Sequence, residues 1–524
     1  MRSARLLDSL FGIDGRSLAT FRIGVGALVL LDLWTRASAI EQHYSDLGVL
    51  PRDAYARLLA VSDWQWSIHF LTGSVVGQSI LFLIAAVAAC ALTAGYRTRL
   101  AAVVTWFMLV SLQARNPMVL YGADQLLRLL LFWSMFLPLG CTWSIDRWRA
   151  TFPSPATTRH LSMASGALLL QPCVMYFVAG LLKLNPSWQS GSALTHALSA
   201  DMYVTPFGRM LSGYLPFLAV LSQAVPWIEL LAVVPLLMPW RTTAFRIAGL
   251  LLLTAFHLGV SAVLSTGLFP ATAFVALVPF IPAQVWDRLA VGLRSFVGPP
   301  VARGRLSSQP ARRANPRGIS TATQLLVAAL FAYGLVWNVV GLRLEEYTAQ
   351  QSLNWARQWW SEGRTGVPLS FRDYTVERMM GGFGWIGRVS ALHQRWDMFS
   401  RVGPQISGWP VIIGTLTDGR KMNLLDGDTP SGPVSHLLPA APLTSYKGTR
   451  WRVYFTGLRG SGLQAARELL PAVVTRDWER QNPGLKLESL RILFAKPANA
   501  SGGSPPVKNE VWYDGPPTGP STGA

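Results

Sequence analysis

The segment LSMASGALLLQPCVMYFVAGLLKL (161–184) is apolar along almost its whole length and has one charged residue, Lys183, near its end. About 20 consecutive apolar residues are needed for a helix to cross a hydrocarbon core of roughly 30 Å. This segment therefore predicts a transmembrane helix that ends in a lysine.

Similar apolar runs lie on both sides of this segment. We expect nine helices, at 17–38, 76–95, 99–114, 121–140, 161–184, 213–238, 244–265, 267–285 and 321–342. The 524-residue chain is 51% hydrophobic and 14% charged, whereas soluble proteins contain about a quarter charged residues. The sequence predicts an α-helical polytopic membrane bundle of about nine transmembrane helices in residues 1–342, followed by a soluble α+β domain.

The net charge of +19 lies mostly in short loops between apolar runs, a pattern that fixes membrane orientation and argues against nucleic acid as a partner. With nine spans, seventeen arginines lie on the side of the N-terminus and five in the interhelical loops of the other side. Because positive loops stay inside, we expect a protein of the cell membrane with a cytoplasmic N-terminus and an extracytoplasmic C-terminal region.

The region after residue 343 has no long apolar run. We expect a soluble domain at 343–499 with an amphipathic helix at 345–361, a hairpin around Asp418-Gly419, a helix at 462–485 and a strand at 487–496. The loop near 286–320 is predicted to be a cytoplasmic linker, and residues 500–524 a disordered tail. The three cysteines have no metal-ligand spacing, so no metal site is predicted.

Ionisable residues inside a membrane are costly and are candidates for function. The candidates in the predicted spans are Arg22, Asp32, Asp124, Arg128, Lys183, Glu229 and His257. Asp124 and Arg128 are four residues apart and are expected to pair on one helix face. For Arg22 and Asp32, structural roles near the two interfaces are favoured.

Lys183, Glu229 and His257 have no partner nearby in the sequence. One interpretation is functional, because a lysine in an apolar pocket gives up its charge readily and can act as a base. The other is structural: Lys183 and Glu229 form a buried ion pair, and a backbone carbonyl satisfies His257. The residue types alone leave both interpretations open.

Four segments, in order along the chain, resemble one family. YFVAGLLKLNPSWQSG (176–191) is similar to the lysine motif of vitamin K-dependent gamma-carboxylases and of their bacterial relatives, the horizontally transferred transmembrane (HTTM) domain proteins. The other segments similar to the family are RNPMVLYGADQLLRLLLFWSMFLPLGCTWSID (115–146), FHLGVSAVLSTGLFPATAFVALVPF (256–280) and the soluble QRWDMFSRVGP (394–404) with its following GW and DGR. The resemblance covers most of residues 15–480.

In the carboxylases, the resemblance implies, a membrane lysine deprotonates reduced vitamin K. Oxygen then converts the quinol to a strong base. This base removes a proton from the γ-carbon of a substrate glutamate, so that CO2 can add there. Lys183 matches that lysine, Asn116 an active-site asparagine, Glu229 an acidic position and His257 a histidine. The carboxylases carry a histidine directly after the asparagine, whereas this chain has Pro117, which has no side-chain proton to give.

Three hypotheses follow. The first is a quinol-dependent, carboxylase-like enzyme with Lys183 as base and a reduced quinone as cofactor. The second is a non-catalytic membrane protein that binds lipid or quinone and whose soluble domain engages an extracytoplasmic protein or peptide; Pro117 favours it. The third is a channel or transporter, but no inverted repeat is visible.

Overall fold

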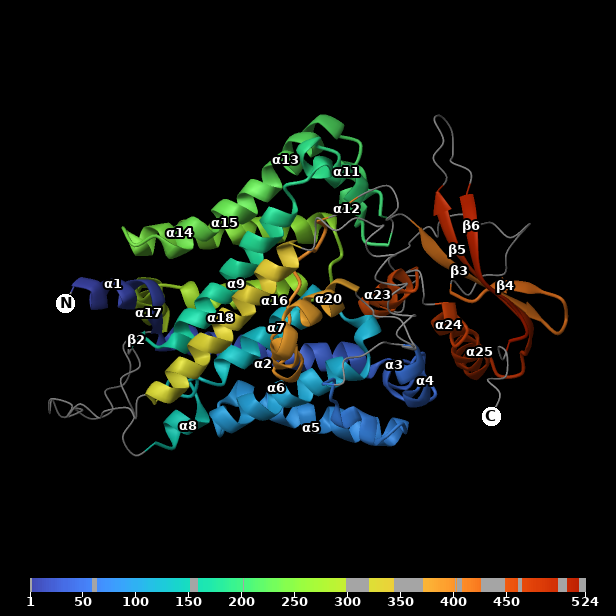
Figure 1. Ribbon diagram of the computed structural model, residues 1–524, viewed down its shortest axis with the longest axis horizontal. Coiled ribbons are helices and arrows are strands. Elements are labelled where there is room, and N and C mark those ends of the chain that lie inside the picture. Colours follow the sequence, from blue (N-terminus) through green and yellow to red (C-terminus); the bar gives the residue numbers. More distant parts are fainter. Residues whose placement is uncertain are drawn as a thin grey trace.

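A computed structural model gives the arrangement of the chain (Figure 1). It describes residues 2–58, 64–150, 159–200, 202–297, 320–343, 371–400, 402, 408–425, 448–459, 464–497 and 507–517. The predicted helix at 345–361 and the linker at 298–318 lie outside the described residues.

Helices form most of the described chain up to residue 343. The first half contains α1 (Arg2–Phe11), α2 (Gly15–Ala37), α3 (Ile40–Tyr44), α4 (Arg52–Leu58), η1 (Ile68–Leu71), α5 (Val75–Ala94), α6 (Thr98–Arg115), η2 (Pro117–Val119), α7 (Gly122–Ser134) and α8 (Ile145–Trp148). The second half contains α9 (Met163–Leu182), α10 (Pro186–Gln189), α11 (Ala193–Leu198), α12 (Pro206–Leu211), α13 (Leu215–Leu231), α14 (Val233–Leu237), α15 (Thr242–Val263), α16 (Phe269–Leu277), η3 (Val278–Phe280), α17 (Ala283–Val297) and α18 (Thr321–Arg343). A two-residue ladder pairs β1 (Ile13–Asp14) with β2 (Arg159–His160).

Six helical segments among the described residues are long and apolar enough to cross a membrane: α2, α5, α9, α13 with α14, α15 and α18. A seventh is added if α16–η3 and the first part of α17, which are bent by 93°, count as one span. The chain is therefore a multi-pass membrane protein. Helices α6 and α7 occupy two further predicted segments but are not among these candidates, so nine spans remain a prediction.

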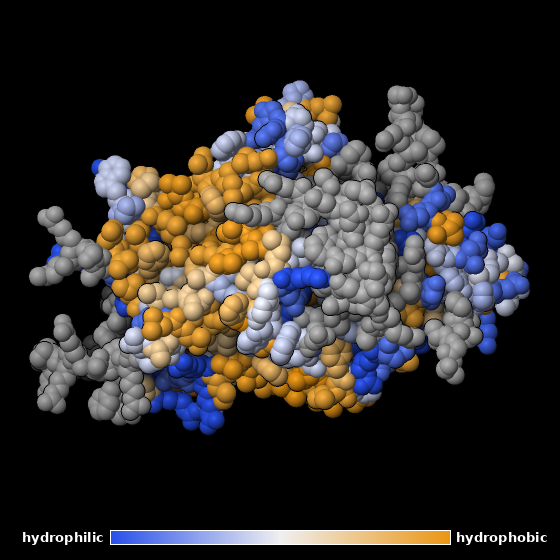
Figure 2. Space-filling model, in the orientation of Figure 1, coloured by the Kyte–Doolittle hydropathy of each residue, from blue (hydrophilic) through white to orange (hydrophobic). Residues whose placement is uncertain are grey.

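Small residues let the helices approach closely, and large apolar residues face outward. A Cβ at Gly26 of α2 would lie 2.1 Å from the Thr93 hydroxyl of α5, so these two helices meet at a glycine. On α5, Val76, Ile80 and Val87 are exposed, as expected for a surface that faces lipid. In Figure 2 apolar residues cover much of the visible face of the bundle, and hydrophilic residues gather at the sheet end.

The C-terminal region contains α20 (Phe371–Met379), η5 (Gly381–Phe383), α21 (Gly384–Val389), α23 (Thr449–Gly457), α24 (Gln464–Arg467) and α25 (Leu470–Gln481). Its antiparallel sheet has the order β4-β3-β5-β6, with β3 (Trp409–Leu416), β4 (Lys421–Asn423), β5 (Leu487–Pro497) and β6 (Val507–Gly515). The predicted hairpin is confirmed: β3 and β4 flank Asp418-Gly419, and Gly419 has a φ of 82°.

Two features of this region differ from the predictions. Leu392 and Trp396 belong to the core of the bundle, so this part of the predicted soluble region packs with the helices. Residues 507–515, predicted to lie in a disordered tail, form β6 and pair with β5. Pairing with β6 covers the open edge of β5, and Trp512 stacks on Phe494 at 5.1 Å. The Gly/Ser/Pro content of the tail concealed this short β-forming segment.

The loop predicted at 286–320 also begins as a helix. Residues 283–297 form α17, which turns away from α16 and η3 after Pro282. Proline cannot continue the hydrogen bonding of the preceding helix, which explains a break at this point.

Candidate active site

An ion pair between two helices lies at the centre of the candidate site. Lys183 Nζ, directly after α9, donates to Glu229 of α13, at 2.7 Å from Oε2 and 3.0 Å from Oε1. The residues are 4% and 6% exposed, so water hardly reaches either charge. The structural interpretation of these two residues predicted this pair, and it is confirmed.

Gly180 allows the pair to form. A Cβ at this position would lie 2.7 Å from Leu230 Cγ and 3.0 Å from the Pro226 carbonyl oxygen. The backbones of α9 and α13 can therefore approach only because residue 180 has no side chain. Pro226 lies inside α13 and cannot donate to the preceding turn, so the helix is weakened beside Glu229.

His257 of α15 is held by a tyrosine. Its Nε2 lies 2.6 Å from the hydroxyl of Tyr176, whereas the structural interpretation expected a backbone carbonyl as partner. The His257 ring is buried among Phe256, Phe269 and Phe274, with ring centroids 5.2 to 5.9 Å away. Its Nδ1 has no hydrogen-bond partner within the described part of the chain. The ring thus presents one free polar atom inside an aromatic surrounding.

Tyr176 lies on α9, the helix that ends at Lys183. It precedes Lys183 by seven residues, so both side chains lie on one face of α9, about 10 Å apart along the axis. Sequence reasoning missed Tyr176, although a tyrosine two turns before a membrane lysine is a detectable pattern. Of the four predicted residues, Lys183 and Glu229 thus contact each other, and His257 contacts Tyr176 of α9.

Asn116 belongs to a different contact network. Its Nδ2 donates to the His43 carbonyl oxygen at 2.8 Å, and its Oδ1 accepts the Met118 amide at 3.1 Å. Pro117 begins η2, where its missing amide proton is not needed. The side chain of Asn116 therefore caps η2 and ties the end of α6 to α3.

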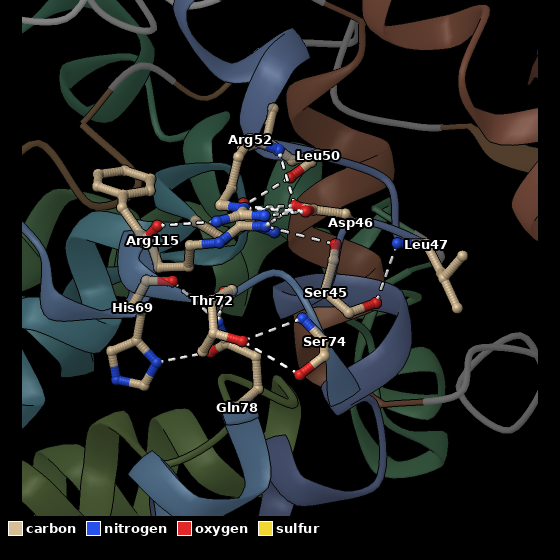
Figure 3. A network of polar contacts seen from close by, with 12 residues as sticks. Ser45, Asp46, Leu47, Leu50, Arg52, His69, Thr72, Ser74, Gln78 and Arg115 are labelled. Carbon is tan, nitrogen blue, oxygen red and sulfur yellow. Dashed lines mark hydrogen bonds and ion pairs between the residues drawn. The ribbon is translucent and has the colours of Figure 1, made fainter. Parts of the chain in front are cut away.

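A polar network, shown in Figure 3, fixes this end of α6. Arg115 donates to the carbonyl oxygens of Leu50 at 2.8 Å and Ser45 at 3.4 Å. Asp46 pairs with Arg52 at 2.7 Å; although burial opposes the effect, hydrogen bonds from Arg52 hold the pKa of Asp46 below its usual range. The loop before α4 is thereby held against α6.

The His43 imidazole, next to Asn116, is 1% exposed. Neither ring nitrogen has a hydrogen-bond partner among the described residues, and Trp451 of α23 lies against the ring at 4.7 Å. Burial, followed by the positive charges of Arg450 and Arg36, lowers the pKa of His43 to about 3. The ring is therefore neutral at physiological pH.

A buried cluster of four charges joins the bundle to α23. Arg36 donates to Asp32 at 2.7 Å and also pairs with Asp124. Arg450 pairs with Asp32 and donates to Asp124 at 2.8 Å. We call these four residues the charge quartet; its two positive and two negative side chains balance.

The quartet corrects one prediction. Asp124 is neutralised by Arg36 and Arg450, and Arg128 donates to the carbonyl oxygens of Ala391 and His393. The predicted pairing of Asp124 with Arg128 within one helix is therefore wrong, because residues distant in sequence offer Asp124 two better-placed guanidinium groups. Arg22, for which a structural role was favoured, is buried and donates to the carbonyl oxygens of Leu139, Thr142 and Trp143.

A C-terminal segment covers the end of α9 next to Lys183. Asn185 Nδ2 donates to the Ser400 carbonyl oxygen at 2.7 Å, and Trp188 Nε1 donates to that of Phe399 at 3.1 Å. The Trp188 ring lies 5.8 Å from Lys183 Nζ. Since Ser400 and Phe399 follow the predicted membrane domain by more than fifty residues, sequence spacing gave no sign of this cover.

The C-terminal region also has a pocket between the sheet and α25. Apolar side chains, among them Ile412, Trp451 and Trp478, form most of its wall. Asp477, whose carboxylate accepts from Gln42 of α3 at 2.9 Å, is the acidic residue in the wall.

Comparison with known proteins adds two findings. A family model of the HTTM domain matches residues 12–286, the range that contains Lys183, Glu229, His257 and Asn116. No solved structure matches the chain.

Proposed function

The chain belongs to the HTTM domain family, and on this premise we propose that it is a quinol-dependent, carboxylase-like membrane enzyme in which Lys183 is the base. The observation that carries the proposal is the buried Lys183–Glu229 pair, with a buried imidazole that has one free nitrogen and is held by Tyr176, two helical turns before Lys183. If the Lys183–Glu229 pair only stabilised the fold, it would not explain the second polar pair on α9, in which Tyr176 holds a buried imidazole that has one nitrogen without a hydrogen bond.

The residues around His257 fit a reduced quinone. Phe256, Phe269 and Phe274 offer aromatic surfaces to a flat ring, and His257 Nδ1 offers one hydrogen bond to a ring oxygen. A reduced quinone would supply a weakly acidic hydroxyl and, with dioxygen, an oxidisable ring.

Lys183 can take up a proton because Glu229 shares its charge. For Lys183 to act as the base, its proton must move to Glu229, whose Oε2 is 2.7 Å away; the Lys183 nitrogen then has a free lone pair. Lys183 Nζ then accepts the hydroxyl proton and becomes an ammonium group, while Glu229 remains protonated. Tyr176 holds the tautomer of His257 through its hydrogen bond to Nε2.

The test is oxygen consumption by the full-length protein in lipid nanodiscs with reduced phylloquinone. Lys183→Met is expected to abolish uptake, but it also leaves Glu229 buried without a partner. The double variant Lys183→Met/Glu229→Gln removes both charges and is expected to fold while staying inactive. Lys421→Met, at an exposed position of β4, is the matched control and should keep the wild-type rate. Wild-type uptake by the folded double variant would refute the proposal.

A second candidate function is supported by the pocket and by Pro117. In this alternative the bundle binds a lipid or quinone without catalysis, and an extracytoplasmic protein or peptide inserts an apolar side chain between Trp451 and Trp478. Pro117→His would then bring no oxygen uptake, and native lipid or quinone would co-purify with the wild-type protein. Ile412→Arg would abolish the partner's binding without changing the lipid content.

The orientation is part of the same proposal. We propose nine spans, including α6 and α7, with the N-terminus in the cytoplasm and residues 343–524 outside the cell membrane. The arginine bias between alternate loops supports this topology. In a variant without native cysteines, a membrane-impermeant maleimide should label Thr417→Cys in intact cells and Ala150→Cys only after permeabilisation. The reverse pattern would refute the orientation.

A further inference from the structure

Helix α8 and the turn between α5 and α6 lie at the end of the bundle remote from the sheet (Figure 1). They carry exposed aromatic and basic side chains. We call Tyr96, Arg97, Trp143, Trp148 and Arg149 the Tyr96 patch; they lie in the turn between α5 and α6 and in and around α8. Trp148 is 85% exposed and Tyr96 37% exposed. Because the candidate span α5 ends at Ala94, two residues before Tyr96, the patch lies where a bilayer has its headgroups.

Two guanidinium groups share one aromatic ring in this patch. The Arg97 and Arg149 guanidinium carbons lie 5.9 and 5.7 Å from the Tyr96 ring centroid. Neither arginine forms an ion pair with a carboxylate in the part of the chain that the structure describes. Exposed cation–π contacts are weak, so both groups keep most of their capacity to bind an anion.

The nearby carboxylate does not compete for these charges. Asp146 Oδ1 accepts the Arg97 amide at 2.8 Å, and Oδ2 accepts the Thr98 amide and hydroxyl at 2.7 and 2.6 Å. The carboxylate thus caps the start of α6, and these hydrogen bonds, despite burial, keep the pKa of Asp146 below its usual range. Asp146 stabilises the turn, and the guanidinium groups of Arg97 and Arg149 stay exposed at the surface.

The patch is also rigid. Buried Arg22 of α2 fixes the loop before α8 by donating to the Trp143 carbonyl oxygen at 2.5 Å and to that of Leu139 at 2.9 Å. The Asp146 amide donates to the Gly95 carbonyl oxygen at 2.9 Å, which joins α8 to the turn that carries Tyr96. Both arginines are thereby presented from one ordered surface.

We propose that the Tyr96 patch binds the phosphate of an anionic phospholipid headgroup. Arg97 and Arg149 supply the charge, since basic residues near an anionic surface are attracted to it. Trp143 and Trp148 enter the interfacial layer, where indole rings are favoured. A zwitterionic headgroup offers the same phosphate but adds a cation, so phosphatidylglycerol is preferred over phosphatidylcholine.

Native mass spectrometry of the full-length protein, titrated with phosphatidylglycerol or phosphatidylcholine, tests the proposal. Arg97→Gln/Arg149→Gln is expected to weaken phosphatidylglycerol binding roughly tenfold or more and to weaken phosphatidylcholine binding much less, so that the preference for phosphatidylglycerol is lost. The control Arg420→Gln/Arg491→Gln removes the same net charge from exposed positions of the sheet region and should bind as wild type does.

Three results would overturn the proposal. Unchanged phosphatidylglycerol binding in the patch variant would show that the two arginines do not contact the lipid. An equal loss in the control would show that net charge, and no defined site, attracts the lipid. Displacement of phosphatidylglycerol by millimolar inorganic phosphate, at matched ionic strength, would show that the patch takes a free anion.

Discussion

The charge quartet and the Lys183 site are both buried and ionic, but they differ in how completely they are satisfied. In the quartet each carboxylate contacts two guanidinium groups and each guanidinium contacts two carboxylates. At the Lys183 site one cation contacts one carboxylate, and His257, which is bound to Tyr176 on the same helix α9, has a ring nitrogen without a hydrogen bond among the described residues. A fully satisfied network specifies structure, whereas a partly satisfied one leaves capacity to bind and exchange protons.

The two sites also differ in what they connect. The quartet joins α2 and α7 to α23, across hundreds of residues of sequence, and so fixes the C-terminal region on the bundle. The Lys183 site joins helices within the matched HTTM domain. We therefore expect quartet variants to act on stability and Lys183-site variants to act on chemistry.

The largest expected effect is the loss of one quartet carboxylate. Asp124→Asn leaves Arg36 and Arg450 to share one aspartate in a buried site. The free energy of unfolding should fall by about 3–5 kcal/mol, measured by reversible unfolding in mixed micelles. Asp418→Asn, which breaks an exposed pair with Arg420, is the control and should leave stability unchanged. If Asp124→Asn is as stable as this control, the quartet does not stabilise the fold and the proposed difference between the two sites is refuted.

Gly180→Ala tests the contact between α9 and α13. The new Cβ would meet Leu230 and the Pro226 carbonyl oxygen, so the helices must separate and the Lys183–Glu229 contact lengthens. We expect a stability loss of about 1–3 kcal/mol and a reduced rate of oxygen uptake with reduced phylloquinone. Gly259→Ala on α15, where a Cβ meets nothing within 4 Å, should leave the rate unchanged. Equal rates in both variants would show that the close approach is not needed.

His43 makes the quartet end of the protein sensitive to acid. The folded state holds its pKa near 3, below the ordinary 6.5, so the unfolded chain binds a proton first as pH falls. The stabilising contribution is therefore complete above pH 6.5 and is lost progressively towards pH 3. Between pH 6.5 and 5 the loss should be roughly 2 kcal/mol. His43→Gln should flatten this part of the stability–pH curve; an unaltered slope would contradict the assignment.

The smallest effect is expected at the exposed edge of the contact between α3 and α25. Glu41 of α3 accepts from Arg480 of α25 at 2.9 Å, and this hydrogen bond, followed by the charges of Arg480 and Arg476, lowers the pKa of Glu41 although burial opposes it. The contact is present above the ordinary carboxyl pKa and is lost as pH falls through the lowered value. Hydrogen exchange of α25 should rise slightly in acid, in high salt and in Glu41→Gln. If hydrogen exchange of α25 is unchanged in acid, in high salt and in Glu41→Gln, Glu41 does not stabilise α25.

Much of the fold was predictable because its signals are local. The run at 161–184 predicts a span from its length, and the alternation around Asp418-Gly419 predicts a hairpin. The ordered motifs indicated the HTTM family, which the family match confirms. Lys183, Glu229 and His257 could be listed as candidates because an ionisable residue in an apolar run is visible without a structure.

The sequence by itself determined that the chain enters a membrane and which residues are costly there, because helix length and apolar content are properties of single segments. Only the tertiary structure decided the partners. Arg450 reaches Asp32 and Asp124 because α23 packs on the bundle, and no periodicity links positions so far apart. The same holds for Tyr176 beside His257 and for Ser400 over α9: side-chain contacts between distant segments depend on how the whole chain packs.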